Sequence, residues 1–286
     1  MKARYSCHLA LFVLLLLLNA TQTVFANETP WQEVAPGAEL RLISANKMSG
    51  DGFVHAAIQL RMEPGLKTYW RIPGETGIPM IANWEGSTNV KTAKMLWPMP
   101  TRSLAYEVMD YIYEGDLTIP LQVVLATDDR NAILNARLNL GICSDICVPV
   151  LWKGSLQIDL EKPSTGHAFR IQAAYAKVPI EDDRADAPFE KMGYDVALDQ
   201  FITLPAADPL TNKTLILDLP KSLLLFDLPH SDPESGLLTV ESLADFDLST
   251  LVGQQIRLTY DSAVGPFTKL VKIEALSRVD LLSENK

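Results

Sequence analysis

The stretch LNLGICSDICVPV, residues 138–150, contains two cysteines, Cys143 and Cys147, with three residues between them. An alternating apolar run leads up to Gly141, and Pro149 follows the second cysteine, which predicts a strand that runs into a tight loop. A straight strand would hold the Cα atoms of positions i and i+4 about 13 Å apart, whereas a disulfide needs them within about 7 Å. The stretch therefore predicts a bend or a hairpin tip at the two cysteines.

A disulfide in so short a loop would stabilise the fold by only about 2 kcal/mol, which is little for a chain of this length. Three explanations of the pair remain open. It is an inert disulfide at a sheet edge, a redox pair that exchanges with a partner disulfide, or a pair of soft thiolates that binds Cu(I). Redox exchange is the preferred hypothesis. The three intervening residues and the lack of a βαβ pattern differ from thioredoxin, so another scaffold must present the pair.

Cu(I) binding is kept as the alternative function, for a periplasmic copper-binding module or chaperone. A cysteine pair with this spacing followed by proline also resembles the copper chaperones of the Sco family, which add a distant histidine. The chain beyond its N-terminal segment has His55, His167 and His230, and only His55 lies in the same predicted domain as the cysteines. Because a lone histidine is more often a surface or packing residue than a ligand, we expect no metal site and no cofactor.

The N-terminus has the pattern of a secretory signal peptide, residues 1–26, cleaved after Ala26. Two basic residues precede an apolar run over residues 9–18, which is shorter than the 20 or so residues that a membrane-spanning helix needs. Cleavage would remove Cys7 and leave an even number of cysteines, as in compartments where disulfides persist. We therefore expect a periplasmic protein that is not inserted in the membrane.

Acidic residues outnumber basic ones in this chain of 286 residues, which has a formal charge of −10. Loss of the signal peptide leaves 23 basic against 35 acidic residues, a charge of −12. Such a surface argues against nucleic acid and anionic membranes as partners. Between the cysteines lies Asp145, and the nearest basic residues in the sequence, Arg137 and Lys153, are each six residues from the pair. Because a nearby carboxylate disfavours a thiolate, the pair is expected to be a sluggish nucleophile.

Short runs of alternating or continuous apolar residues recur through the first half, without amphipathic helices between them. This rhythm predicts an all-β fold and favours an antiparallel β-sandwich. Pro120 lies inside one of the runs and predicts an edge strand or a bulge there. The principal predicted strands are 39–45, 52–62, 67–72, 117–126, 132–140 and 151–160.

The chain is predicted to form two domains after the signal peptide. Residues 27–162 form the first, residues 163–190 a helix and a linker, and residues 191–286 a second, mainly β domain of unknown role. Within the connection, Pro163-Ser164-Thr165 can cap a helix over 166–177. The segment 179–188 is acidic and flanked by prolines, so it is the predicted linker.

Three stretches together resemble the N-terminal periplasmic domain of the disulfide reductase DsbD and its relative ScsB. They are YWRIPGETGIP (69–79), YIYEGDLTIPLQV (111–123) and the cysteine loop GICSDICVP (141–149). The resemblance covers Trp31 to Leu160. It implies an immunoglobulin-like sandwich in the thiol:disulfide interchange, or protein-disulfide reductase, family. It also implies electron transfer from a membrane-embedded thiol reductase to thioredoxin-like periplasmic proteins.

The resemblance also assigns roles to individual residues. Cys143 and Cys147 would be the redox pair, and by family position Cys147 would form the mixed disulfide. Tyr106 falls where the family has an aromatic residue that caps the disulfide. Tyr69 and Trp70 match an aromatic stretch beside the site, and core packing is the preferred interpretation of Tyr69. The chain lacks the family's membrane carrier and thioredoxin-like domain, so it would depend on separate partners.

Overall fold

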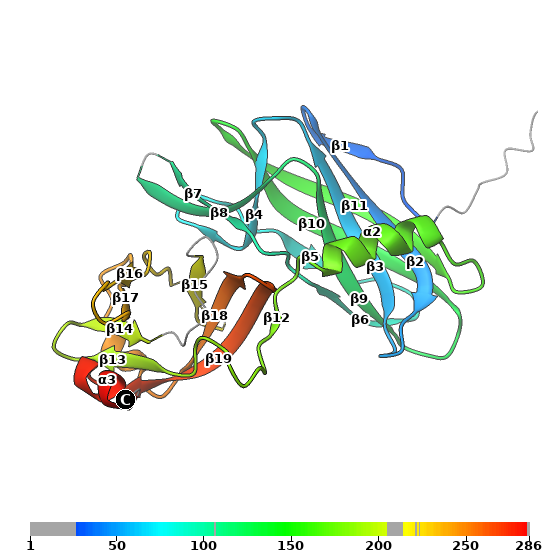
Figure 1. The fold of residues 1–286 in the computed structure, drawn as a ribbon. Helices are drawn as coiled ribbons and strands as arrows, with labels where there is room; N and C mark the ends of the chain where they lie inside the picture. The colour runs from blue at the N-terminus through cyan, green and yellow to red at the C-terminus, as the bar shows by residue number, and fades with distance from the viewer. Residues whose placement is uncertain (1–26, 106, 205–213, 221, 223, 285–286) are drawn as a thin grey trace, which may run out of the picture.

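In the part of the chain that the structure describes, the fold has three mainly antiparallel sheets, two α-helices and one short 3-10 turn (Figure 1). The computed structural model describes residues 27–286, apart from 106, 205–213, 221, 223 and 285–286. The predicted signal peptide, with Cys7, lies outside the described residues. In the described part of the chain, neither helix is long and apolar enough to span a membrane.

The first two sheets face each other and form the predicted sandwich. The first sheet has the order β1-β2-β3-β9-β6, and the second has the order β11-β10-β4-β8-β7, with β5 paired to β10. Their strands are β1 Gln32–Ala35, β2 Ala38–Met48, β3 Val54–Met62, β4 Lys67–Gly74, β5 Ile81–Asn83, β6 Val90–Met95, β7 Thr101–Ala105, β8 Val108–Glu114, β9 Leu117–Leu125, β10 Asn131–Cys143 and β11 Cys147–Asp159.

The core between the two sheets follows from the alternation of each strand. In β10 every second residue from Ala132 to Ile142 is buried, and in β9 the buried residues include Ile119, Leu121 and Val123. Successive side chains of a strand point to opposite faces, so the residues between these positions lie on the outer face of the sandwich. Cys143 belongs to that outer set.

Pro120 lies in an inner strand, so the prediction of an edge strand at this position was wrong. β9 is paired with β3 on one side and with β6 on the other. The carbonyl of Pro120 accepts from the Leu96 N–H at 2.8 Å, just past the end of β6 at Met95. Because N–H and C=O of one strand residue point to the same side, the N–H that proline lacks would face the point where β6 ends.

The predicted helix is confirmed as α2, Thr165–Tyr175, with Ser164 as its N-cap. It lies across the outer face of the first sheet, where Ile171 packs on Ile43, Ala45 and Ala57. The helix therefore covers part of β2 and β3. From its end the chain runs on to β12 and the third sheet (Figure 1).

The third sheet makes the second part of the chain mainly β, as predicted. Its order is β15-β18-β19-β13-β14-β17-β16, with β12 paired in parallel to β19. The elements are β12 Ile180–Glu181, β13 Met192–Asp195, β14 Gln200–Thr203, β15 Leu215–Asp218, β16 His230–Ser231, β17 Leu238–Val240, the 3-10 turn η2 Leu248–Leu251, β18 Gln255–Ser262, β19 Gly265–Ala275 and the helix α3 Arg278–Glu284.

The predicted linker, 179–188, is in part a component of the third sheet. Within it β12 pairs with β19, and Asp182 is buried. Asp182 accepts hydrogen bonds from the Arg184 side chain at 2.8 and 2.9 Å and from the hydroxyl of Tyr260. Polar contacts therefore hold a segment whose composition, poor in large apolar residues, predicted an open connection.

Asp218 joins the third sheet to the sandwich. It is 1% exposed and accepts two hydrogen bonds from Arg71 of β4, at 2.7 and 2.9 Å, and one from Arg257 of β18 at 3.1 Å. Nearby, Ile216 belongs to the sandwich core, and the side chain of Arg102 donates to the Leu215 carbonyl. A bidentate pair with a fully buried carboxylate is the strong form of an ion pair.

Replacing Asp218 by alanine should lower the free energy of unfolding by about 3 kcal/mol, because two guanidinium groups lose their shared buried partner. The matched control is Glu161→Ala, which removes an ion pair with Arg130 in which both side chains are more than half exposed. That change should cost less than about 0.5 kcal/mol. Urea denaturation followed by tryptophan fluorescence measures both, and equal losses would contradict this assignment.

Candidate functional site

The two cysteines meet at the tip of the β10–β11 hairpin, as the sequence predicts. Cys143 and Cys147 are cross-strand partners in the register of this hairpin, with a Cα–Cα distance of 4.0 Å, and their sulfurs form a disulfide. Directly paired residues point to the same face of a sheet. The disulfide therefore lies on the outer face of the second sheet, away from the sandwich core.

The two sulfurs differ in their access to solvent. Cys143 is fully buried, whereas Cys147 is half-buried at the start of β11. The apolar neighbours of Cys147 are open to solvent, with Ile146 at 77% and Val148 at 45% exposure. Cys147 is therefore partly open to solvent beside exposed apolar side chains, whereas Cys143 is not.

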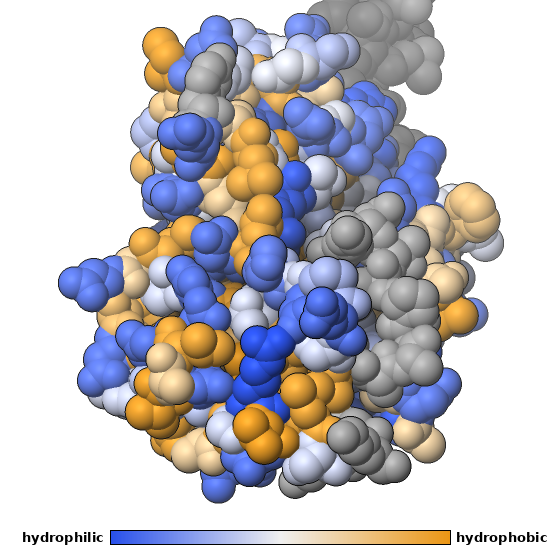
Figure 2. All heavy atoms as spheres, turned by 60° about the vertical axis from the view of Figure 1, so that its left-hand side comes forward, coloured by the Kyte–Doolittle hydropathy of each residue, from blue (hydrophilic) through white to orange (hydrophobic). Residues whose placement is uncertain are grey.

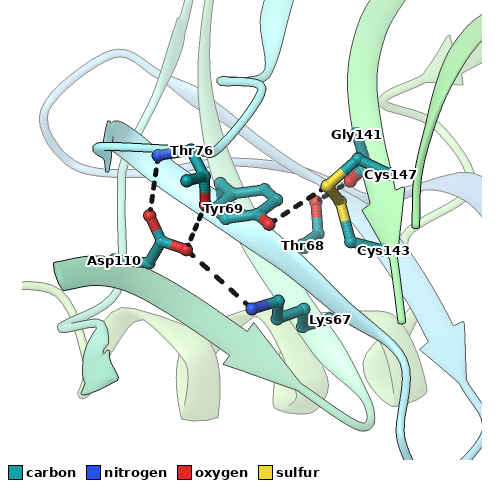
Figure 3. Close-up of a disulfide and its surroundings, with 8 residues drawn as sticks. All are labelled: Lys67, Thr68, Tyr69, Thr76, Asp110, Gly141, Cys143 and Cys147. Atoms are coloured by element: carbon teal, nitrogen blue, oxygen red, sulfur yellow. Dashed lines mark hydrogen bonds and ion pairs between the residues drawn. A yellow bond between two sulfur atoms is a disulfide. The ribbon is translucent and has the colours of Figure 1, made fainter. Parts of the chain in front are cut away.

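Tyr69 of β4 forms one wall of the site. Its hydroxyl lies 3.3 Å from the Cys147 sulfur, and its ring belongs to an apolar cluster with Ile112 and the two cysteines (Figure 3). The ring is buried although it lies on the outer face of the sheet. Sequence reasoning preferred core packing for Tyr69, but the structure places it against the disulfide.

A loop over residues 75–79, here called the covering loop, buries this part of the outer face. A Cβ at Gly77 would lie 2.2 Å from the Tyr69 ring, and a Cβ at Gly141 would lie 2.8 Å from Ile78. Both positions therefore require glycine for the loop to approach the sheet. On the neighbouring strand, Thr68 fixes β4 to β10 through a 2.8 Å hydrogen bond from its hydroxyl to the Gly141 carbonyl.

Asp110 of β8 anchors the covering loop. It is buried, and it accepts hydrogen bonds from the Thr76 N–H at 3.1 Å and the Thr76 hydroxyl at 2.7 Å. Lys67 of β4 places its Nζ 3.9 Å from the same carboxylate (Figure 3). These contacts place one cation and one carboxylate beside Tyr69.

The pKa of the Tyr69 hydroxyl is raised above its ordinary value. Burial is the main cause, repulsion from Asp110 adds to it, and a hydrogen bond with Thr76 partly offsets it. The hydroxyl therefore stays protonated throughout the neutral range. In that state it can donate a hydrogen bond to a sulfur of the pair.

The structure brings together only some of the residues predicted for the site. Trp70 points into the sandwich core and stacks edge-on to Tyr111 at 5.7 Å, because adjacent strand residues face opposite ways. It therefore lies on the other face of β4 from the disulfide. Tyr106 lies outside the described residues.

Sequence reasoning missed Lys67, Thr76, Asp110 and Ile112 as neighbours of the pair. Thr76 falls inside the stretch 69–79, and Ile112 inside 111–123, so the stretches that carry the resemblance contain part of the signal. Lys67 has no local signal, because it reaches the cysteines only through strand pairing. Lys153, which follows Cys147 by six residues in the sequence, is not the cation that lies beside the pair.

The histidines considered for copper have other contacts or lie elsewhere. His55 bonds to the Tyr175 hydroxyl at 2.9 Å, His167 lies 3.2 Å from Glu28, and His230 is in β16 of the third sheet. Among the residues that the structure describes, no group of three or more His, Cys, Asp or Glu side chains is arranged to hold a metal ion.

Most of the sandwich is similar to a known protein family. Residues 40–155 match the family described as thiol:disulfide interchange protein DsbD, N-terminal. The predicted resemblance to DsbD is confirmed. The matched range contains the disulfide, Tyr69, Lys67 and the covering loop.

A solved structure resembles this fold over more of the chain than the family match does. The N-terminal periplasmic domain of ScsB from Proteus mirabilis superposes with a TM-score of 0.68 at 22% identity. The match covers 88% of this chain and 100% of that one, so the similarity of fold continues beyond residues 40–155. It supports an immunoglobulin-like β fold of the DsbD N-terminal type. No curated protein matches the chain.

Tyr69→Phe should keep the fold and raise the pKa of the Cys147 thiol in the reduced protein by about half a unit to one unit. The reason is that a hydrogen bond to the thiolate favours the charged form. The pH dependence of Cys147 alkylation by iodoacetamide, resolved by mass spectrometry, measures this shift.

Tyr175→Phe is the matched control, since this hydroxyl contacts His55 under α2 and not the disulfide. It should leave the Cys147 pKa unchanged. An identical Cys147 titration in Tyr69→Phe and in the unaltered protein would show that the hydroxyl does not act on the sulfur.

Proposed function

We propose that this chain is a periplasmic thiol-disulfide exchange protein. In this proposal the Cys143/Cys147 pair relays electrons from a membrane-embedded thiol reductase to thioredoxin-like periplasmic proteins. The observation that carries it is a disulfide at a hairpin tip with one buried and one accessible sulfur. The match to the DsbD N-terminal family over residues 40–155 supports it. We take residues 27–162 as the redox domain and residues 1–26 as a signal peptide for export.

The unequal access of the two sulfurs suggests the order of the reaction. In the reduced pair, the Cys147 thiolate attacks the disulfide of the acceptor, whose S–S bond breaks as one acceptor thiolate leaves and takes up a proton. The Cys143 thiolate then attacks the Cys147 sulfur of this mixed disulfide. The Cys143–Cys147 bond forms, and the second acceptor thiolate is released. The acceptor has gained two electrons, which the membrane reductase later restores to the pair.

The surroundings of Cys147 suit contact with another protein. Ile146 and Val148 on either side are exposed, and Leu151 on the same face of β11 is 82% exposed. Figure 2 shows that apolar side chains lie among charged ones on the side of the molecule that it presents. Exposed apolar side chains grouped around a reactive atom are typical of interaction sites. Tyr69 would shield the pair from inside, and the predicted outer cap, Tyr106, would complete the shield.

Cysteine-to-serine variants of the exported full chain test this proposal. Cys143→Ser keeps the accessible thiol but removes the one that resolves the mixed disulfide, so it should accumulate mixed disulfides with thioredoxin-like proteins. Cys147→Ser keeps only the buried thiol and should trap about tenfold less. Acid-quenched cells analysed on non-reducing gels and by mass spectrometry give the result. If neither variant traps a thioredoxin-like protein, the proposal is wrong.

Cu(I) binding by the same two thiolates is distinguished by a titration of the reduced protein. If the pair serves electron transfer, a competing chelator should take Cu(I) from the reduced protein, because thiol exchange does not require the two thiolates to hold a metal ion. In parallel, the reduced protein should transfer electrons to oxidised thioredoxin. Tight one-to-one copper binding without thiol exchange would instead favour the copper function.

A further inference from the structure

Four side chains form a row across the outer face of the second sheet at the site. Cys143 pairs with Cys147 on one side and with Lys67 on the other, and Lys67 pairs in turn with Glu114 of β8. Directly opposite residues have Cβ atoms about 4.5–5.5 Å apart and point to the same face. Lys67 is therefore the immediate neighbour of Cys143, on the side away from Cys147.

The ammonium group of Lys67 is held at this face. Its Nζ lies 3.9 Å from Asp110 and 5.8 Å from the centre of the Tyr69 ring, and only 22% of the side chain is exposed. Thr76 fixes the Asp110 carboxylate through two hydrogen bonds (Figure 3). The cation therefore stays in the half-buried surroundings of the disulfide, where a charge is screened less than in open water.

A cation beside Cys143 would offset the effect of burial on its thiol. Its sulfur is fully buried, and burial disfavours a thiolate. The charged and titratable groups nearest to it on β4, β8 and the hairpin tip, by strand register, contact or sequence, are Lys67, Tyr69, Asp110, Glu114 and Asp145. Of these described groups, only Lys67 is positively charged. Without Lys67, burial and three carboxylates would all disfavour the Cys143 thiolate.

We infer that Lys67 is a positioning residue that stabilises the Cys143 thiolate and so speeds the release of the mixed disulfide. This inference rests on the proposed exchange function. The Cys143 thiol gives its proton to water, and its sulfur then attacks Cys147 as described above. Asp110 sets the strength of the effect, because the carboxylate both holds Lys67 and offsets part of its charge.

Lys67→Met, which keeps the stem and removes the charge, tests the inference. Measured in a Cys147→Ser background by thiolate absorbance at 240 nm, the Cys143 pKa should rise by about one unit. With Cys147 present, the release of a preformed mixed disulfide with thioredoxin should slow about three- to tenfold at neutral pH. The loss of thiolate is partly offset, because a more basic thiolate is a better nucleophile.

Two further variants separate charge from structure. Lys67→Arg should restore the Cys143 pKa, because it returns a positive charge to the same strand position. Lys153→Met is the matched control, since Lys153 is exposed on the same face of β11, about 20 Å from Cys147 along the strand, and should change neither readout.

The outcomes distinguish this inference from the proposed function. If Lys67→Met leaves the Cys143 pKa unchanged while exchange with thioredoxin continues, the inference is overturned and Lys67 serves only to balance Asp110. A loss of stability in Lys67→Met without a change in pKa leads to the same conclusion. If the unaltered protein exchanges with no thioredoxin-like protein, the function fails, whereas the pKa measurement still shows whether Lys67 acts on Cys143.

Discussion

The pairing of Cys143 with a neighbour on each side is the constraint on which the site depends. β11 brings the second sulfur, and β4 brings a cation and an aromatic ring. This register is fixed by the alternation of β10, whose residues from Ala132 to Ile142 are buried at every second position. A slip by one residue would turn the buried set to solvent and the sulfurs toward the core. The hydrophobic core thus determines where the disulfide lies.

Strand β4 connects three parts of the molecule within three residues. Tyr69 faces outward to the disulfide, Trp70 faces inward to the core, and Arg71 reaches Asp218 of the third sheet. The opposite directions of Tyr69 and Trp70 follow from strand geometry, and the ion pair of Arg71 ties the strand to the third sheet. The wall of the site is therefore supported by both the sandwich and the third sheet.

The site lies on an outer face, yet most of it is buried. Gly77 and Gly141 have no side chain, so the covering loop can lie against Tyr69 and the end of β10. Asp110 holds that loop through Thr76 and also meets Lys67, so the same carboxylate organises the cover and the charge. What remains open is Cys147 with its exposed apolar neighbours. A protein that binds at this face would therefore contact Cys147 and not Cys143.

The sequence by itself determined the local features. The cysteine spacing predicted a bend or a hairpin tip, the alternating runs predicted an all-β sandwich, and Pro163-Ser164-Thr165 predicted the start of α2. Only the tertiary structure decided that Tyr69 and not Trp70 meets the disulfide, that Pro120 lies in an inner strand, and that Lys67 stands beside Cys143. The physical reason is that periodicity shows which residues share a face of one strand. Which strands lie side by side depends on contacts between distant segments, and no local pattern records them.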